Sequence, residues 1–332
     1  MRKRRLLTIP GYLLAALAGL ASAPLWIPAL ALVDLLRPGR RAALRCGLFF
    51  QFYFLCEVLG ILASGALWLL PGSPERRTER LYRLEWWWGT TLMRGAMRIF
   101  GMTVALEGEE QVRRGPMLVF LRHASIADTV LACGFICWPF GIRLRYVLKR
   151  ELLWDPCLDI VGNQLPNVFI DRESADPEAE IQAIAALARD LGERDGVLIY
   201  PEGTRFTPAR REALLERFKQ KGRDDLAARA DALRHVLPPR AGGPLALIRT
   251  SPSTDVVFCA HEGFEGAATF GSLWRGALVG RRVTVKFWRV PAAEIPDDPD
   301  ARERWLFDQW SRIDAWLATL RERREAAPAS AH

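Results

Sequence analysis

The stretch PMLVFLRHASIADTVL, residues 116–131, decides how the rest of the sequence is interpreted. It begins with an apolar run of strand length, passes through a short polar turn and continues into a second apolar run. This order places His123 and Asp128 at the carboxyl end of a strand, where open α/β sheets usually build their sites. Residues five apart lie about 140° apart around a helix. The two side chains therefore meet only if His123 lies on the turn that enters the helix.

A histidine that is hydrogen-bonded to an aspartate has a fixed tautomer, and its second ring nitrogen can accept a proton. The pair therefore indicates a general base. A structural alternative is open, in which His123 caps the helix and Asp128 binds backbone amides. A serine hydrolase is a further alternative because Ser125 is close by, but the chain has no GxSxG turn. Ser125 also lies too close in sequence to be a comfortable partner for the histidine.

Other apolar runs of strand length alternate with helical stretches along the chain. These runs are residues 142–148, 196–201, 254–260 and 281–290. Residues 176–194 predict a helix with Asp176 as its N-cap and Pro177 behind it. We predict an α/β domain over residues 76–332, with a mixed, largely parallel central sheet flanked by helices.

Two helical additions belong to this domain. Residues 208–236 are heavily charged, which favours a solvated helix pair laid over the domain. Residues 301–324 place apolar side chains along one face of an amphipathic helix. We expect that face to pack against the domain. Its tryptophans also fit a helix that lies at the bilayer interface, which is the alternative.

Residues 1–75 predict a membrane-anchoring hydrophobic hairpin. Residues 6–36 carry one charged residue, Asp34, and residues 47–70 carry only Glu57. Each stretch is long enough to span a bilayer core, and the first is too long for a cleaved signal. Basic residues flank both stretches and prolines interrupt the first, so a two-span hairpin and a re-entrant segment both fit.

Both topologies place the body of the protein on the cytoplasmic side. We expect Trp86, Trp87 and Trp88 to anchor it at the bilayer interface. The net charge of +8 suits a phosphate-rich partner. Nucleic acid is excluded because the basic residues cluster at membrane flanks and site loops, and no recognition motif is present. The six cysteines form no CxxC pair, so neither a zinc site nor a disulfide framework is expected.

Four loops place a cation near the end of an apolar run, and two of them include glycines that let backbone approach a ligand. Their polar residues and turn glycine are Lys149; Asp171 and Arg172; Glu202, Gly203 and Arg205; and Arg240. One such loop alone does not indicate a binding site. Four together predict a phosphate site with guanidinium groups for bidentate contacts.

With these blocks the sequence resembles the glycerolipid acyltransferases, the family of lysophosphatidic acid acyltransferase. HASIAD matches the HxxxxD motif of that family, and VFIDR, YPEGTR and LPPRAGG follow in the family's order, so the likeness covers about residues 90–260. It departs from the family pattern at Arg122, where asparagine is common, and at Leu158 and Asp159, where a glycine is usual.

The resemblance implies that His123 acts as base on an acceptor hydroxyl, with Asp128 as its orienting partner. The hydroxyl then attacks the thioester of acyl-CoA or acyl carrier protein directly, without an acyl-enzyme. The groups implied to bind the acceptor's glycerol phosphate are Asp171, Arg172, Glu202, Gly203 and Arg205, with Arg240 near the acceptor or the carrier and Lys149 as a further phosphate contact. No metal or redox cofactor is expected. Residues 129–142 are the candidate acyl-chain groove, with a plain core helix as the alternative.

The expected enzyme transfers a fatty acyl group to the free hydroxyl of a lysophospholipid, with 1-acyl-glycerol 3-phosphate as the first candidate and phosphatidic acid as product. The alternatives are another acceptor, such as a lysophosphatidylinositol-like lipid, and a non-catalytic membrane lipid-binding protein. The expected location is the inner membrane of a bacterium, with the catalytic domain on the cytoplasmic side.

Overall fold

A seven-stranded sheet forms the centre of the molecule. This computed structural model describes residues 2–37, 42–125, 128–171, 176–220, 222–265 and 270–326. The strands are β1 (Thr103–Glu107), β2 (Met117–Leu121), β3 (Arg143–Lys149), β4 (Val168–Ile170), β5 (Asp195–Ile199), β6 (Asp255–Glu262) and β7 (Arg282–Val290). Their order is β1-β7-β6-β2-β5-β3-β4, and each neighbouring pair is parallel except β6 with β7. The predicted α/β class with a mixed, largely parallel sheet is confirmed.

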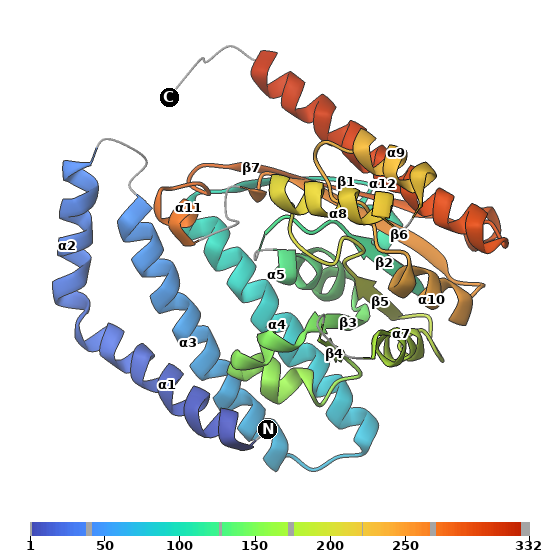
Figure 1. Ribbon diagram of the computed structural model, residues 1–332. Coiled ribbons are helices and arrows are strands. Elements are labelled where there is room, and N and C mark those ends of the chain that lie inside the picture. The colour runs from blue at the N-terminus through green and yellow to red at the C-terminus, as the bar shows by residue number, and fades with distance from the viewer. Residues whose placement is uncertain are drawn as a thin grey trace.

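Helices cover both faces of this sheet (Figure 1). The helices of the described residues are α1 (Arg2–Ala21), α2 (Ala23–Leu36), α3 (Ala42–Leu69), α4 (Pro74–Phe100), α5 (Asp128–Ala132), α6 (Trp138–Phe140), α7 (Pro177–Ala186), α8 (Pro208–Gln220), α9 (Asp224–Ala232), α10 (Gly242–Thr250), α11 (Phe270–Trp274) and α12 (Pro299–Ala326). Met117, Val119 and Leu121 of β2 belong to the core with α4 and α5, and Leu118 and Phe120 to the core with α7, α10 and α12. All five residues are buried, as expected of a strand covered on both faces.

The five apolar runs expected to be strands are β2, β3, β5, β6 and β7. β1 and β4 lie outside those runs. β1 is an edge strand whose ends are exposed, and β4 contains three residues. Neither is long or apolar enough to show the alternation by which a strand is recognised.

The predicted helical regions contain helices, but α7 ends at Ala186, short of the predicted end at residue 194, and the chain continues there in turns. α7 follows Asp176, whose carboxylate accepts a hydrogen bond from the Ala179 N–H at 3.0 Å. α8 and α9 form the charged pair and pack on α12. The face of α12 that contacts the sheet core consists of the buried residues Leu306, Trp310, Ile313 and Leu317. The apolar face of the C-terminal helix is therefore part of the core.

Three helices make up the N-terminal region where a hairpin is predicted. α3 is long and apolar enough to cross a membrane, and α1 with α2 passes the same test as one segment bent by 73°. Such a bend fits a broken span or a re-entrant segment, so both predicted topologies stay open. The side chains that α1, α2 and α3 expose include Leu6, Leu7, Leu14, Leu25, Leu35, Leu62, Trp68 and Leu69. The division of the chain at residue 75 stays a prediction.

Polar contacts tie these helices to the α/β body. Arg4 and Arg5 form ion pairs with the buried Asp159 carboxylate at 2.6 and 2.9 Å. Asp159 is one of the positions that depart from the acyltransferase pattern. In this chain its carboxylate is the partner of the N-terminal arginines. The only acidic residue in α3, Glu57, is buried and accepts a hydrogen bond from the Trp88 indole at 2.7 Å.

The expected interfacial anchor at Trp86, Trp87 and Trp88 is wrong for two of its three side chains. Trp86 and Trp88 are buried in α4, Trp86 in the core beneath the sheet and Trp88 against α3. An aromatic run on a helix indicates burial as readily as a bilayer interface, and here Trp86 and Trp88 are buried by packing on two sides of α4.

Candidate active site

The polar residues of the sequence motifs meet at the carboxyl edge of the sheet. β2 ends at Leu121 and leads to His123, and β5 ends at Ile199 and leads to Glu202. These strands are parallel neighbours, so the loops that follow them leave the sheet at the same edge. β3 pairs in parallel with β5 on its far side and brings Lys149 to that edge as well.

His123 and Asp128 form the pair that their spacing predicts. His123 lies on the turn before α5, and Asp128 is the first residue of that helix. The His123 Nδ1 lies 3.1 Å from Asp128 Oδ2. Among the described residues no hydrogen-bond partner is found for His123 Nε2. Because Nδ1 donates to the carboxylate, Nε2 has a free lone pair and can accept a proton.

The Asp128 carboxylate is buried and held by backbone groups. Its Oδ2 accepts the N–H groups of Ala124 and Ser125 at 2.6 and 2.8 Å, and its Oδ1 accepts the Ser125 hydroxyl at 3.1 Å. Burial alone would raise its pKa, but the imidazoles of His261 and His123 and the Ser125 amide outweigh burial and hold the pKa of Asp128 below its ordinary value. Asp128 is therefore ionised at neutral pH and stabilises a protonated His123.

A second histidine contacts the same carboxylate from inside the protein. His261 of β6 is fully buried, with Nε2 3.0 Å from the Arg122 carbonyl oxygen and 3.4 Å from Asp128 Oδ1. A carbonyl oxygen only accepts, so Nε2 carries the proton. Burial lowers the pKa of His261, and its buried Nδ1 has no partner within the described parts of the chain. His261 thus donates to the Arg122 carbonyl and lies against the Asp128 carboxylate, which it helps to fix.

Glu202 lies beneath the site and supports its backbone. Its side chain is fully buried, Oε1 accepts the His123 N–H at 2.9 Å and Oε2 accepts the Leu237 N–H at 3.0 Å. Burial raises the pKa of Glu202 to about 7, against the opposing attraction of the Arg122 guanidinium. The carboxylate therefore joins the loop after β2 to the loop before α10. The sequence predicts an acceptor contact for Glu202, whereas the structure gives both of its oxygens to backbone amides.

Arg122, the departure beside the histidine, points away from the site. Its side chain is buried, and its guanidinium donates to the carbonyl oxygens of His261 and His235 and forms an ion pair with Glu265. The attraction of Arg122 outweighs burial and lowers the pKa of Glu265 to about 2. Arg122 therefore ties three segments together below the reacting groups.

A cavity of about 320 Å³ opens beside His123. The predicted cations Lys149, Arg205 and Arg240 line it together with Gly203 and Asp171. Its apolar wall comes from the ends of β3, β4 and β5 and from α7, through Val147, Leu148, Leu152, Ile170, Ile181, Ile184 and Ile199. The cavity therefore joins a basic part and an apolar part at one histidine.

Gly203 allows Arg240 to lie against the turn after β5. Gly203 has φ +69°, and a Cβ there would come within 3.0 Å of the Arg240 side chain. The Arg240 N–H donates to the Pro201 carbonyl at 2.8 Å, which holds the two loops together. Burial and the nearby Arg217 lower the pKa of Arg240. An anion bound in the cavity would relieve both effects.

The remaining predicted residues lie at the cavity rim or outside the described chain. Asp171 lines the rim, and its carboxylate lies 3.6 Å from the Arg150 guanidinium. An exposed carboxylate repels phosphate, so its contact with a glycerol hydroxyl is the chemistry that this position allows. Arg172 lies outside the described residues. The three cations and Gly203 are brought together as predicted, but their roles stay predictions.

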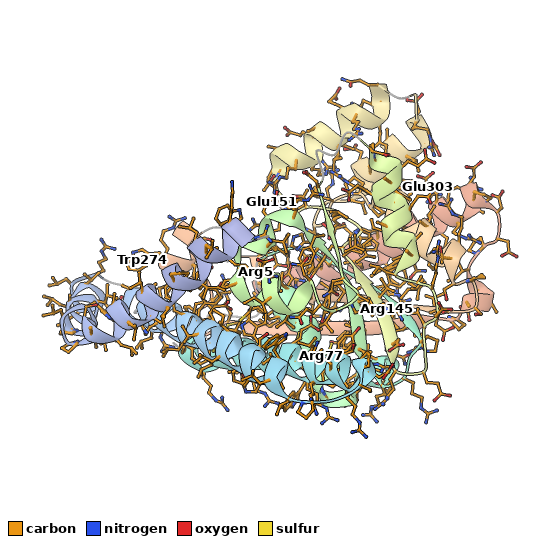
Figure 2. The ribbon with its side chains drawn as sticks, turned by 90° about the horizontal axis from the view of Figure 1, so that it is seen from below. Arg5, Arg77, Arg145, Glu151, Trp274 and Glu303 are labelled. Atoms are coloured by element: carbon orange, nitrogen blue, oxygen red, sulfur yellow. The ribbon has the colours of Figure 1, made fainter. Side chains whose placement is uncertain are left out.

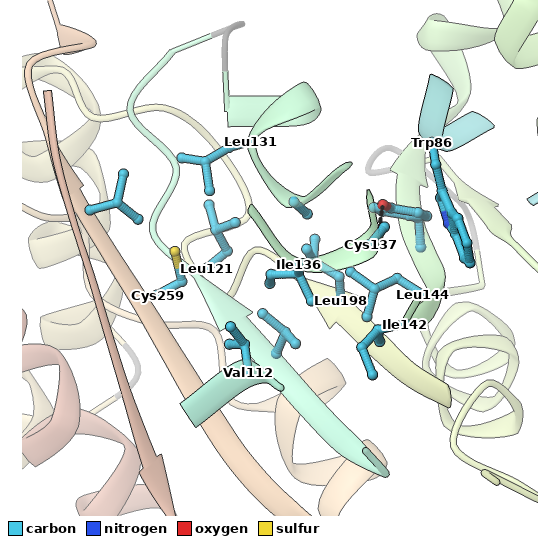
Figure 3. Packing of buried hydrophobic residues seen from close by; sticks show 14 of the residues in the cluster. Trp86, Val112, Leu121, Leu131, Ile136, Cys137, Ile142, Leu144, Leu198 and Cys259 are labelled. Carbon is cyan, nitrogen blue, oxygen red and sulfur yellow. Dashed lines mark hydrogen bonds between the residues drawn. The ribbon is translucent and has the colours of Figure 1, made fainter. Parts of the chain in front are cut away.

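The predicted acyl-chain groove at residues 129–142 is wrong as to its place. Leu131, Ile136 and Cys137 of this segment are fully buried against the sheet, next to Leu121 and Leu198 (Figure 3). Thr129 is the one member of the segment that lines the cavity. The open alternative, a core helix, is correct for most of the segment, and α7 supplies the apolar wall instead.

Asp314 of α12 is a site-supporting residue that sequence patterns do not indicate. Its Oδ1 accepts the N–H groups of Arg234, His235 and Val236 at 3.0, 2.6 and 3.1 Å. The next residue, Leu237, donates to Glu202. An aspartate on an amphipathic helix resembles any solvated charge, so only tertiary structure shows this contact.

Comparison with known proteins shows that the chain is similar to acyltransferases. Residues 103–242 match the protein-family model named Acyltransferase. The mouse 1-acyl-sn-glycerol-3-phosphate acyltransferase gamma is 28% identical over 285 residues, which are 81% of this chain and 69% of that protein. The human 1-acyl-sn-glycerol-3-phosphate acyltransferase delta is 25% identical over 241 residues, which are 70% of this chain and 58% of that protein. The chain thus spans about six to seven tenths of these relatives' lengths.

A solved structure has the same fold. The crystal structure of the 1-acyl-sn-glycerophosphate (LPA) acyltransferase PlsC from Thermotoga maritima superposes with a TM-score of 0.55 at 17% sequence identity. The match covers 83% of this chain and 98% of that one, so it includes N-terminal helices as well as the sheet.

Proposed function

We propose that this chain, whose residues 103–242 match the Acyltransferase family model, transfers a fatty acyl group to the free hydroxyl of a lysophospholipid. The proposed acceptor is 1-acyl-glycerol 3-phosphate and the proposed product is phosphatidic acid. The acyl donor is acyl-CoA or acyl carrier protein. The observation that carries the proposal is one cavity in which His123, three cations and an apolar wall meet.

The proposed reaction uses His123 twice. Its Nε2 takes the proton from the acceptor hydroxyl while the oxygen attacks the thioester carbonyl, and the Asp128 carboxylate stabilises the imidazolium that forms. The tetrahedral intermediate then collapses, the carbon–sulfur bond breaks, and the imidazolium returns its proton to the departing thiolate. Ester and free thiol are the products, and His123 ends neutral as it began. No step requires a metal or a redox cofactor.

The cavity lining supports a lysophospholipid acceptor. Arg205 and Arg240 offer guanidinium groups that bind a phosphate monoester in bidentate fashion, and Lys149 adds a point charge. The isoleucines of α7 and β4 offer an apolar surface for an acyl chain. A neutral acceptor would offer these cations no charge, and a zwitterionic one would offer a single phosphodiester charge that its own cation already offsets. An assay of purified protein with labelled acyl-CoA and a panel of lysophospholipids tests the proposal, and preferential use of a zwitterionic acceptor would contradict it.

The proposed location is a membrane, with the domain on the cytoplasmic side. The apolar α3 and the exposed leucines of α1 and α2 support membrane association. Acceptor and product are both lipids, so a site near the headgroups spares the acyl chain from crossing water.

We expect Arg205→Ala to raise KM for the lysophospholipid about tenfold while KM for the thioester and kcat change little. The reason is that a lost phosphate contact weakens ground-state and transition-state binding equally. Steady-state kinetics with each substrate varied in turn measures both constants. Arg229→Ala, which breaks a surface ion pair with Asp308, is the matched control and should leave both unchanged. A rise in KM for the thioester alone would instead indicate that Arg205 binds the acyl carrier.

We expect Ser125→Ala to retain activity within about tenfold of the unaltered protein. Ser125 is fully buried and its hydroxyl faces Asp128, so it supports the pair but does not reach a thioester. Loss of one hydrogen bond to a buried carboxylate accounts for a change of about this size. Mass spectrometry of protein quenched during turnover should show no acylated form. An acyl-Ser125 species would replace the direct transfer with a hydrolase-like mechanism.

A further inference from the structure

A second cavity lies between the N-terminal helices and the body, away from the active site. Its volume is about 430 Å³, and it is lined by residues of α1, α3 and α4 and of the turn around residues 160–164. None of its lining residues also lines the cavity at His123. The second cavity is therefore a separate site, and the acyl-transfer reaction does not account for it.

The polar part of this cavity is strongly basic. Arg5, Arg77 and Arg80 line it, and no carboxylate does among the described residues. Figure 2 shows Arg5 on α1 and Arg77 near the start of α4, on the side of the molecule seen from below. Arg77 and Arg80 bring two guanidinium groups to this space with no carboxylate partner among the described residues, and their charges repel each other unless an anion joins them.

Two of these arginines are already held in place. Arg5 pairs with Asp159 at 2.9 Å, and the Arg80 guanidinium donates to the Pro71 carbonyl at 3.0 Å. For the guanidinium of Arg77 no partner is found within the described parts of the chain. The fixed pair shapes the cavity, and Arg77 remains to bind a ligand with its full set of donors.

The other part of the cavity is apolar and continues onto an exposed apolar surface. Its walls include Ile9, Ile61, Leu67, Trp68 and Ile160. Around them Leu62, Trp68, Leu69 and Leu70 of the α3 end are exposed. A tryptophan beside arginines at the end of an apolar helix is the pattern of a bilayer interface. The cavity thus has a charged end and a lipid-facing end.

We propose that this cavity binds one anionic phospholipid, with the phosphate on Arg77 and Arg80 and the acyl chains along the end of α3. A basic pocket between membrane helices that carries an apolar extension matches the two halves of such a lipid. A soluble phosphate compound would satisfy the arginines but leave Ile9, Ile61 and Trp68 without a partner. The bound lipid would fix the angle between α1, α3 and the body.

One test fills the cavity without removing a charge. A Cβ at Gly65, which lines the cavity, or at Gly11 of α1, which does not, meets no atom within 4 Å. Gly65→Leu should therefore fold, since leucine is also the better helix former, and should occupy the lipid space. Gly11→Leu is the matched control, with the same chemical change in another helix.

A second test removes the unpaired charge. Arg77→Ala deletes a guanidinium that lines the cavity, whereas Arg76→Ala deletes the neighbouring exposed one that does not. Full-length protein is placed in nanodiscs of phosphatidylcholine with one tenth phosphatidylglycerol and is then released into detergent. Native mass spectrometry counts the phospholipids retained.

We expect about one phosphatidylglycerol per unaltered protein, the same for Arg76→Ala and Gly11→Leu, and an occupancy at least about fivefold lower for Arg77→Ala and Gly65→Leu. Equal retention by all five proteins, or no preference over phosphatidylcholine, would overturn the proposal. Displacement of the lipid by millimolar inorganic phosphate would show a phosphate site and would also overturn it. The readout is binding, so it is independent of whether the chain transfers acyl groups.

Discussion

His123→Ala is expected to lower kcat of acyl transfer by about 10³-fold or more while the protein remains folded and membrane-bound. General base catalysis contributes about 10²–10⁴-fold, and here one group serves as base and then as acid. The ring contacts Tyr200, with its centroid 4.7 Å away, and Asp128, so its removal leaves a small space and no broken backbone contact. Single-turnover transfer to a labelled lysophospholipid measures the loss.

His235→Ala is the matched control, because it removes a histidine that pairs with Arg321 and lies outside the cavity. It should keep near-normal turnover. Near-normal turnover of His123→Ala itself, in a preparation free of host acyltransferases, would show that His123 is not the base. A loss of thermal stability in His123→Ala that is much larger than in His235→Ala would show that folding rather than chemistry is being measured.

Asp128→Asn is expected to fall almost as far as the histidine variant. An asparagine keeps the size of the side chain but removes the charge that stabilises the imidazolium, and the same change in a Ser-His-Asp triad lowers kcat by about 10⁴-fold. Its NH2 group would also face N–H donors of Ala124 and Ser125 or the Ser125 hydroxyl. A variant that retained a tenth of the activity would favour the structural alternative, in which Asp128 serves only the turn.

The contact between His123 and Asp128 could be predicted from sequence because its geometry is local. Five residues separate His123 from Asp128, and the strand, turn and helix that position them adjoin one another in the chain. The cations at the ends of β3, β5 and the loop before α10 could also be predicted, because parallel strands bring their carboxyl ends to one edge. The strands and helices that carry these residues are predicted from hydrophobic periodicity, which sequence shows directly.

What could not be predicted depends on contacts between distant segments. His261 lies on β6 and Asp314 on α12, and nothing in their own neighbourhoods distinguishes them from packing or solvated residues. The sequence cannot decide between an acyl-chain groove and a core helix at residues 129–142, because a buried helix and a lipid-binding helix have the same composition. For Glu202 the sequence predicts an acceptor contact, because a charged residue in a glycine turn fits either a ligand-binding or a supporting role, and only the positions of two amides distinguish them.

The site therefore has a reactive surface and a polar support beneath it. His123, Arg205 and Arg240 line the cavity, whereas Asp128, His261, Glu202, Arg122 and Asp314 hold the loops that carry them. Buried polar groups of this kind are costly unless each is satisfied, and here most of their hydrogen bonds go to backbone N–H or C=O groups. The support thus fixes loop positions directly, and it links β2, β5, β6 and α12 in one network.

Glu202→Gln is expected to lower kcat about 10²-fold with little change in either KM. A glutamine of the same shape accepts at one end only, so its NH2 group would face either the His123 N–H or the Leu237 N–H. The repelled loop shifts, and a displacement of about 1 Å at a reacting group costs about 10²-fold. A rise in acceptor KM at unchanged kcat would instead return Glu202 to its first predicted role as an acceptor contact.

The same variant has a distinct pH signature. Burial raises the pKa of Glu202 from 4.5 to about 7 in the folded protein, so between these values the native state holds a proton that the unfolded state has released. The stability from this proton is complete below pH 4.5 and is lost as the pH rises through 7. Relative to Glu202→Gln, which does not titrate, the unaltered protein should therefore lose Tm steadily from pH 5 to pH 8 in detergent.

Glu216→Gln, at an exposed position on α8, should show no such difference from the unaltered protein, because its carboxylate is solvated in both states. A Tm difference between Glu202→Gln and the unaltered protein that stayed constant across this range would mean that Glu202 remains ionised throughout and that its two amide hydrogen bonds outweigh burial.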